Sequence, residues 1–163
     1  MIFMKHFITA ISLAKDLKTT VYKNAESVDF LKNDHEFSHP ILVPIFNLAE
    51  KGEKIKVTVI LTSKTSPFVK QNYEHFVGEL NRLRDDIGFD YGEINLIEAS
   101  YDESSSKHLK LFESIINSIG RDELITADVT YGNKPTSMAL QLALTYSYLY
   151  GDNTAAKALG YGE

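Results

Sequence analysis

Residues 128–137, Asp-Val-Thr-Tyr-Gly-Asn-Lys-Pro-Thr-Ser, combine residue types that suit a phosphate. Gly132 permits close approach of the backbone, Lys134 supplies a positive charge, and the amides at the start of a following helix favour an anion. The polar side chains of the segment are further candidate ligand contacts: Asp128, Thr130, Tyr131, Asn133, Thr136 and Ser137. The structural alternative is a strand-to-helix turn in which Asp128 and Thr130 only satisfy loop amides.

The usual nucleotide-binding signatures are missing from the sequence. The segment lacks the G-x-x-x-x-G-K spacing of a Walker loop, and no G-x-G-x-x-G follows the first predicted strand. No motif in the sequence therefore indicates ATP hydrolysis or dinucleotide binding, and we expect no cofactor.

Apolar runs and helical spacings alternate along the chain. They predict strands at 3–11, 55–61, 93–99, 124–130 and 155–161, and helices at 40–51, 67–87, 104–119 and 136–150. Alternation of this kind predicts an α/β fold: a doubly wound, mainly parallel Rossmann-like sheet of about five strands with helices on both faces. With no linker or internal repeat, residues 1–163 are expected to form one domain.

The common strand order 3-2-1-4-5 reverses between strands 1 and 4, and ligands bind outside the carboxyl ends of those strands. The loop after the first strand then contributes Thr9, Ser12 and Lys15, with loop capping as the alternative role for Ser12. The loop after the second strand contributes Thr62, Ser63 and Lys64 to the same edge, with a helix cap as the alternative.

Asp128-Val-Thr-Tyr-Gly resembles the strand-4 motif of the CRISPR-associated Rossmann-fold (CARF) domains, in particular their DxTHG branch. The similarity extends to the layout of nearly the whole chain, including the strand end Leu61-Thr-Ser and the terminal Leu159-Gly-Tyr-Gly-Glu. Tyr131 stands where the branch has histidine, so the role of that histidine does not transfer.

The resemblance implies a homodimer that binds a cyclic oligoadenylate, most readily cyclic tetra-adenylate, across its two-fold axis in a type III CRISPR response. It also implies metal-free ring cleavage, in which a ribose 2′-hydroxyl attacks the adjacent phosphodiester and leaves a 2′,3′-cyclic phosphate. Ser12 and Lys134 are the candidates that stabilise the developing charge. The alternative is a non-catalytic sensor domain of a larger effector.

A second motif, His35-Glu-Phe-Ser-His39, matches the H-E-x-x-H signature of zinc metallopeptidases. That mechanism requires both histidines on one face of a regular helix. Pro40 biases His39 away from helical dihedrals, so an exposed polar loop is the expected structure and the zinc hydrolase remains a remote alternative.

Composition excludes several other classes. The 163 residues carry 22 acidic and 17 basic side chains and a net charge of -5, which argues against duplex nucleic acid as a partner. The chain contains no cysteine, so we expect a reducing, cytoplasmic location without disulfides or thiolate metal sites. No apolar run reaches the roughly 20 residues of a membrane span, so we expect no membrane partner.

Overall fold

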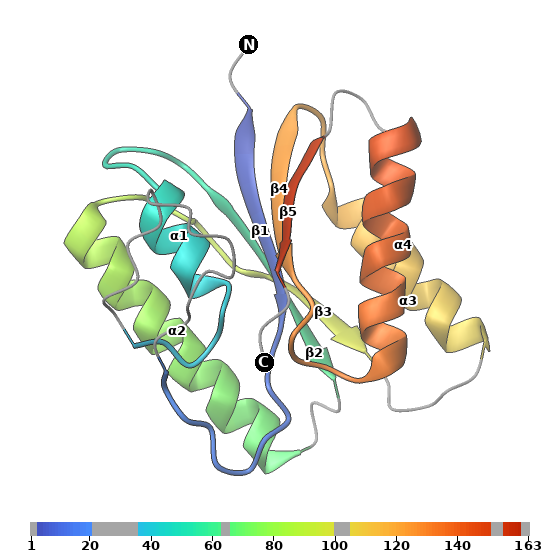
Figure 1. Ribbon diagram of the computed structural model, residues 1–163, viewed down its shortest axis with the longest axis horizontal. Helices are drawn as coiled ribbons and strands as arrows, with labels where there is room; N and C mark the ends of the chain where they lie inside the picture. The colour runs from blue at the N-terminus through green and yellow to red at the C-terminus, as the bar shows by residue number, and fades with distance from the viewer. Residues whose placement is uncertain (1–2, 21–35, 63–65, 100–104, 151–154, 161–163) are drawn as a thin grey trace.

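The computed structural model describes residues 3–20, 36–62, 66–99, 105–150 and 155–160, the last six and Ser105 by their backbone only. Its centre is a parallel sheet with strand order β3-β2-β1-β4-β5 (Figure 1). The strands are β1 (Met4–Ala10), β2 (Lys56–Thr62), β3 (Asn95–Ala99), β4 (Glu123–Asp128) and β5 (Ala155–Gly160). The α/β Rossmann-like class and the reversal of strand order beside β1 are confirmed.

Two helices cover each face of the sheet (Figure 1). The helices α1 (Leu42–Leu48) and α2 (Pro67–Ile87) lie on one side, and α3 (Ser105–Ser118) and α4 (Lys134–Tyr150) lie on the other. No helix within the described ranges is both long and apolar enough to span a lipid bilayer.

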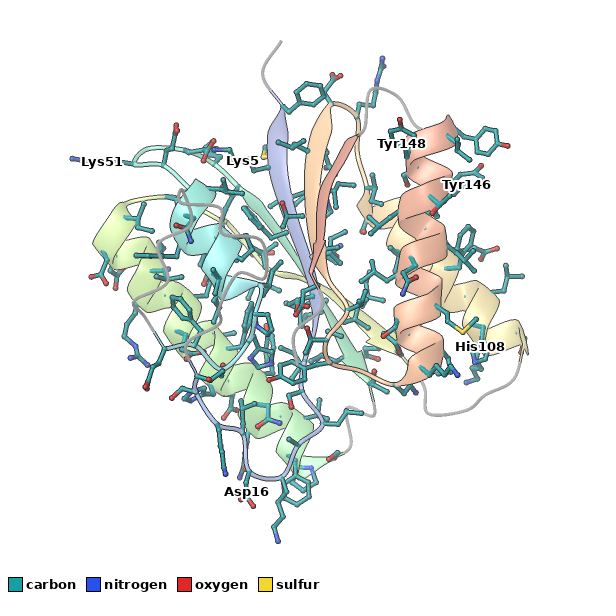
Figure 2. The ribbon with its side chains drawn as sticks, in the orientation of Figure 1. Lys5, Asp16, Lys51, His108, Tyr146 and Tyr148 are labelled. Carbon is teal, nitrogen blue, oxygen red and sulfur yellow. The ribbon has the colours of Figure 1, made fainter. Side chains whose placement is uncertain are left out.

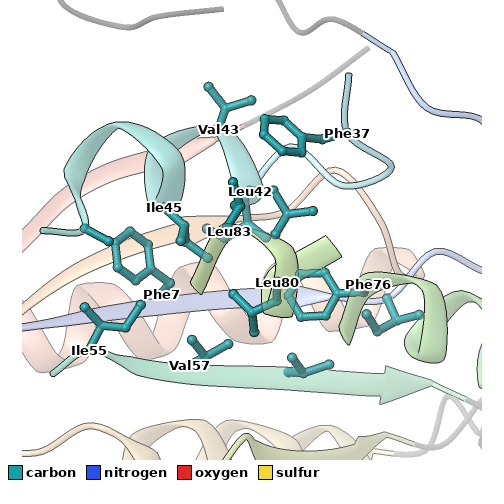
Figure 3. Packing of buried hydrophobic residues seen from close by; sticks show 14 of the residues in the cluster. Phe7, Phe37, Leu42, Val43, Ile45, Ile55, Val57, Phe76, Leu80 and Leu83 are labelled. Atoms are coloured by element: carbon teal, nitrogen blue, oxygen red, sulfur yellow. The ribbon is translucent and has the colours of Figure 1, made fainter. Parts of the chain in front are cut away.

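The sheet is buried on both faces, which explains the near-continuous apolar run of β2. Alternate side chains of a strand point to opposite faces, so Phe7 joins the core under α1 and α2 while Ile8 joins the core under α3 and α4. Figure 3 shows the first core, in which Phe7 of β1, Val57 of β2 and Leu80 of α2 are buried in one cluster. Each such fully buried side chain stabilises the fold by roughly 1.5–3 kcal/mol.

Helix boundaries follow local chemistry. The predicted helix 67–87 is confirmed, and Gly88 ends it in the left-handed conformation at φ 95°. The helix expected at 40–51 is shorter: α1 begins only at Leu42, after Pro40, and ends before the extended Ala49. In contrast, α4 begins at Lys134, two residues before the expected start, because Pro135 is tolerated in a first turn.

A buried polar cluster lies near the amino ends of the strands. Glu123 of β4 accepts hydrogen bonds from His6 Nδ1 at 2.7 Å and from Lys56 Nζ at 2.9 Å, and His6 Nε2 lies 2.6 Å from Thr58 Oγ1. Burial lowers the pKa of His6. Burial also acts to raise the pKa of Glu123, but the hydrogen bonds from His6 and Lys56 outweigh it and lower the value.

Candidate functional site at the carboxyl edge of the sheet

The two loops predicted to form the site meet at the carboxyl edge of the sheet. Thr9 and Asp128 are register partners in the β1–β4 pair. Behind them, Gly132 adopts φ 98°, and a Cβ placed there would lie 3.2 Å from the Cβ of Ala10. Glycine at 132 is therefore required both by the backbone conformation and by the close approach to β1.

Most polar groups of the 128–137 loop bond to one another. Asn133 caps α4: its Oδ1 accepts hydrogen bonds from the Thr136 amide at 3.1 Å and the Thr136 hydroxyl at 2.6 Å. Ser137 donates its hydroxyl to the Val129 carbonyl at 3.2 Å. Pro135 has no amide hydrogen and the Thr136 amide bonds to Asn133, so these two positions of the helix start have no free amide for an anion. The predicted role of the amides around Gly132 and Asn133 stays a prediction. The exposed Lys134 is the cation that α4 offers to an anion at this edge.

Asp128 has one satisfied and one unsatisfied carboxylate oxygen. Its Oδ1 accepts from the Thr130 amide at 3.1 Å and from the Thr130 hydroxyl at 2.5 Å, as in the turn considered as the structural alternative. Its Oδ2 is buried and has no hydrogen-bond partner. Asp128 is only 2% exposed, and burial raises its pKa from 3.8 to about 6 despite the opposing bonds from Thr130.

Two further unsatisfied atoms lie at the same edge. In the described part of the chain, the buried side-chain polar atoms without a partner are Asp128 Oδ2, Thr62 Oγ1 and His108 Nε2. Asp128 ends β4, Thr62 ends β2, and His108 lies in the first turn of α3, which follows β3. Buried polar atoms normally have partners, so their concentration at one edge requires an explanation such as a ligand.

The sheet separates Asp128 from Thr62 and His108. Asp128 shares its face with Thr9, on the α1–α2 side, whereas Thr62 alternates in step with Ile60 on the α3–α4 side. Sequence reasoning missed His108 as a site residue. The feature that could have identified His108 is its position in the first turn of α3, because this helix follows β3 and therefore starts at the carboxyl edge of the sheet.

Ser12 lies in a loop-capping geometry, the alternative considered from the sequence. Its Oγ accepts the Ala14 amide at 3.1 Å, its carbonyl accepts Asn72 Nδ2 at 2.7 Å, and its own amide donates to His39 Nε2 at 3.2 Å. Lys15 follows in an exposed position on the same loop. Ser63 and Lys64 lie outside the described residues, so their predicted role stays a prediction.

His39 links the β1 loop to α2 through a chain of buried hydrogen bonds. Because Nε2 accepts the Ser12 amide, Nδ1 carries the proton and donates to Ser38 Oγ at 2.8 Å, and the Ser38 hydroxyl donates to Glu79. Burial, with a smaller contribution from His75, lowers the pKa of His39 to about 3. The imidazole is therefore neutral at physiological pH.

This geometry does not support the zinc alternative. His35 lies outside the described residues, but Glu36–His39 are not helical and both ring nitrogens of His39 are engaged. The exposed polar loop expected for this motif is wrong at Ser38 and His39, which are fully buried. Over the residues that the structure describes, no group of three or more histidine or acidic side chains is arranged to hold a metal ion.

Tyr131 stabilises the same wall of the site. Its hydroxyl donates to the Ser38 carbonyl at 3.1 Å, and its ring contacts His39 edge-on with centroids 5.1 Å apart. The β4–α4 loop, the β1 loop and α2 are thus joined through side chains that pack on one another.

No family model matches this sequence, and no curated protein matches it.

Proposed function

We propose that this protein binds a cyclic oligoadenylate, with cyclic tetra-adenylate as the first candidate, at the carboxyl edge of its sheet, and that it does so as a homodimer in a type III CRISPR response. The observation that supports the proposal is the concentration of Asp128 Oδ2, Thr62 Oγ1 and His108 Nε2 at the carboxyl edge of the sheet, where Asp128 lies beside the reversal of strand order between β1 and β4. The resemblance at Asp128-Val-Thr-Tyr-Gly supplies the class of ligand.

The chemistry of the edge matches the parts of a nucleotide. Asp128 Oδ2 has an unused acceptor position, which suits a ribose hydroxyl or the exocyclic amine of adenine. Lys134 supplies a positive charge for a phosphate. Because Asp128 and Thr62 face opposite sides of the sheet, a ligand that reaches both must extend across the edge. A ring of several nucleotides meets that requirement better than one mononucleotide.

Ring cleavage is the second part of the proposal, with Lys134 and Ser12 stabilising the charge that develops on the phosphate. Binding without cleavage, as in a sensor, is the second candidate function. A specific observation favours it: the hydroxyls of Ser12, Thr136 and Ser137 already take part in intramolecular hydrogen bonds. Those bonds must be replaced before the same groups can act on a ligand.

The test is calorimetric titration of the protein with cyclic tri-, tetra- and hexa-adenylate in EDTA, followed by chromatography of the nucleotides. Lys134→Ala is expected to weaken binding about 10- to 100-fold, since a hydrogen bond to a charged group contributes about 1.5–3 kcal/mol. Lys51→Ala is the control, because Lys51 is exposed and lies far from α4 (Figure 2).

Each outcome decides one part of the proposal. Linear products that disappear with Lys134→Ala support a metal-independent ring nuclease, while bound and intact rings support the sensor. Absence of binding to all three rings would refute the function. Equal binding by the Lys134 and Lys51 variants would remove Lys134 from the site.

A further inference from the structure

A groove between α3 and α4 is apolar along most of its length. Six large side chains line it and are each 46% to 73% exposed: Leu109, Met138, Leu142, Tyr146, Leu149 and Tyr150. The volume of the groove is about 820 Å³. Sites for small molecules usually measure about 300–1,000 Å³ and are lined mainly by apolar and aromatic side chains. The α3–α4 groove therefore has the size and the lining of a site for an apolar small molecule.

The composition of α4 produces the apolar lining. Residues 135–150 include no charged side chain. Leu140 and Ala143 are buried on the sheet, whereas Met138 and Leu142 are exposed on the groove. A helix that is apolar around most of its circumference is normally covered on more than one side. The side of α4 that the sheet leaves uncovered is therefore available to a ligand.

The basic groups of the groove lie at one end. Among the described residues that line it, none is acidic, and the basic ones are Lys134 and His108, in the first turns of α4 and α3. Figure 2 shows His108 at this end and Tyr146 toward the opposite end. His108 Nε2 is buried and has no hydrogen-bond partner. A ring nitrogen of this kind can donate to an anion that is bound beside Lys134.

The apolar part of the groove extends far from its basic end. At a rise of about 1.5 Å per residue, Lys134 and Leu149 lie about 22 Å apart along the axis of α4. The acyl chains of one membrane leaflet fill about 15 Å, which is half of the hydrocarbon core of a bilayer. The groove is therefore long enough for one extended acyl chain of the length found in membrane lipids.

We infer that the α3–α4 groove binds a long-chain fatty acid, with the carboxylate beside Lys134 and His108 and the acyl chain along Leu142. The distribution of charge favours this occupant, because a fatty acid has one anionic end and an apolar remainder. A charged peptide or a nucleic acid carries charge along its length and would find no complementary group beyond the basic end. An uncharged apolar molecule would leave His108 Nε2 buried without a partner.

The groove shares Lys134 and His108 with the edge proposed to bind the nucleotide. A fatty acid that occupies both groups would compete with a cyclic oligoadenylate for them. Only this consequence rests on the proposed function. The assignment of the groove itself rests on its lining, its length and the position of its basic groups.

The test is calorimetric titration of the delipidated full chain, without nucleotide, with octanoate and dodecanoate below their critical micelle concentrations. Full burial of one methylene increases affinity roughly fourfold, so the four additional methylenes of dodecanoate are expected to increase affinity at least about 10-fold in an open groove. The uncharged 1-dodecanol has a chain of the same length. It is expected to bind about 10-fold more weakly than dodecanoate, because it lacks the charge-assisted hydrogen bonds.

Two sets of variants separate the apolar part of the groove from its basic end. Leu142→Glu and, independently, Leu109→Glu place a charge in the apolar part and are expected to weaken dodecanoate binding at least about 10-fold. Leu96→Glu is their matched control, because Leu96 is 46% exposed on β3, outside the groove. Lys134→Gln is expected to weaken dodecanoate binding about 10-fold and to leave 1-dodecanol binding unchanged. Lys51→Gln, at an exposed position, is its control.

Absence of saturable dodecanoate binding would overturn the inference. So would equal affinities for octanoate and dodecanoate, wild-type affinity in both the Leu142 and Leu109 variants, or an equal loss with Leu96→Glu. Equal binding by the Lys134 and Lys51 variants would also overturn it, because the carboxylate would then not lie at the basic end.

Two further measurements complete the design. Far-UV circular dichroism of each variant shows whether it is folded, and the exposure of the substituted positions makes folding the expected result. Sedimentation velocity tests the other occupant: a dimer that Leu142→Glu dissociates, together with no dodecanoate binding, would assign the groove to a second copy and overturn the inference. Since the titration contains no nucleotide, fatty acid binding by a protein that binds no cyclic oligoadenylate would refute the proposed function and leave this inference intact.

Discussion

Replacing Asp128 with asparagine is expected to change how the stability of the protein depends on pH. Burial raises the pKa of this carboxyl from 3.8 to about 6, so the unfolded chain loses the proton at a lower pH than the folded chain. The folded state is therefore penalised progressively as pH rises from about 4 through 6. A difference of about two pKa units corresponds to roughly 3 kcal/mol once both states are ionised.

Asp128→Asn removes this ionisation and keeps an oxygen that can accept the bonds from Thr130. The amide group that replaces Oδ2 has no partner there, but its cost is independent of pH. The free energy of unfolding of the variant, relative to wild type, is thus expected to increase by about 2 kcal/mol between pH ~4.5 and pH ~8.

Urea denaturation followed by circular dichroism at the two pH values measures this difference. Asp86→Asn is the control, because Asp86 is exposed on α2 and its substitution should give nearly the same small effect at both pH values. A stability difference for Asp128→Asn that does not change with pH would contradict a raised pKa of Asp128 in the folded protein. It would mean that the carboxyl titrates alike in the folded and unfolded chains.

Two further predictions concern stability. Gly132→Ala is expected to destabilise the protein by about 1–3 kcal/mol, because it places a side chain on a left-handed backbone beside β1. Gly78→Ala in the open middle of α2 is expected to stabilise the protein by about 0.5–1 kcal/mol. Equal urea midpoints for the two variants and wild type would contradict both expectations. Glu123→Gln is expected to cost about 2–3 kcal/mol at neutral pH, because it weakens the bonds from His6 and Lys56. The loss of stability should shrink as pH falls below about 4.5. The reason is that the pKa of Glu123 is lower in the folded protein, so its carboxylate stabilises the fold above this pH and no longer does so in acid. A loss that is constant down to pH ~3 would contradict this account.

The sequence predicted the elements whose signals are local. The aliphatic run of β2 and the helix 67–87 with Gly88 after it depend on neighbouring residues, and the structure confirms both. The meeting of the β1 and β4 loops followed from topology, because alternating strands and helices leave few ways to connect a parallel sheet.

Features that depend on distant residues could not be predicted. His39 appeared as part of a metal signature, but it bonds to Ser12 across 27 residues of chain, and its neighbour Ser38 bonds to Glu79 across 41 residues. Thr62 Oγ1 and His108 Nε2 are likewise buried without a hydrogen-bond partner because of the residues that pack around them in the folded chain, which the local sequence does not reveal. The cap by Asn133 was different, since its spacing to Thr136 was visible and only the assumed start of α4 concealed it.

The central position of β1 affects how the chain reaches this structure during synthesis. His6 contacts Thr58 across 52 residues of chain and Glu123 across 117 residues. Both edges of β1 therefore stay unpaired until much later segments have left the ribosome, and pairing over such separations is slow. Exposed strand edges of this kind promote aggregation, so the nascent chain is most vulnerable before residues 123–128 emerge.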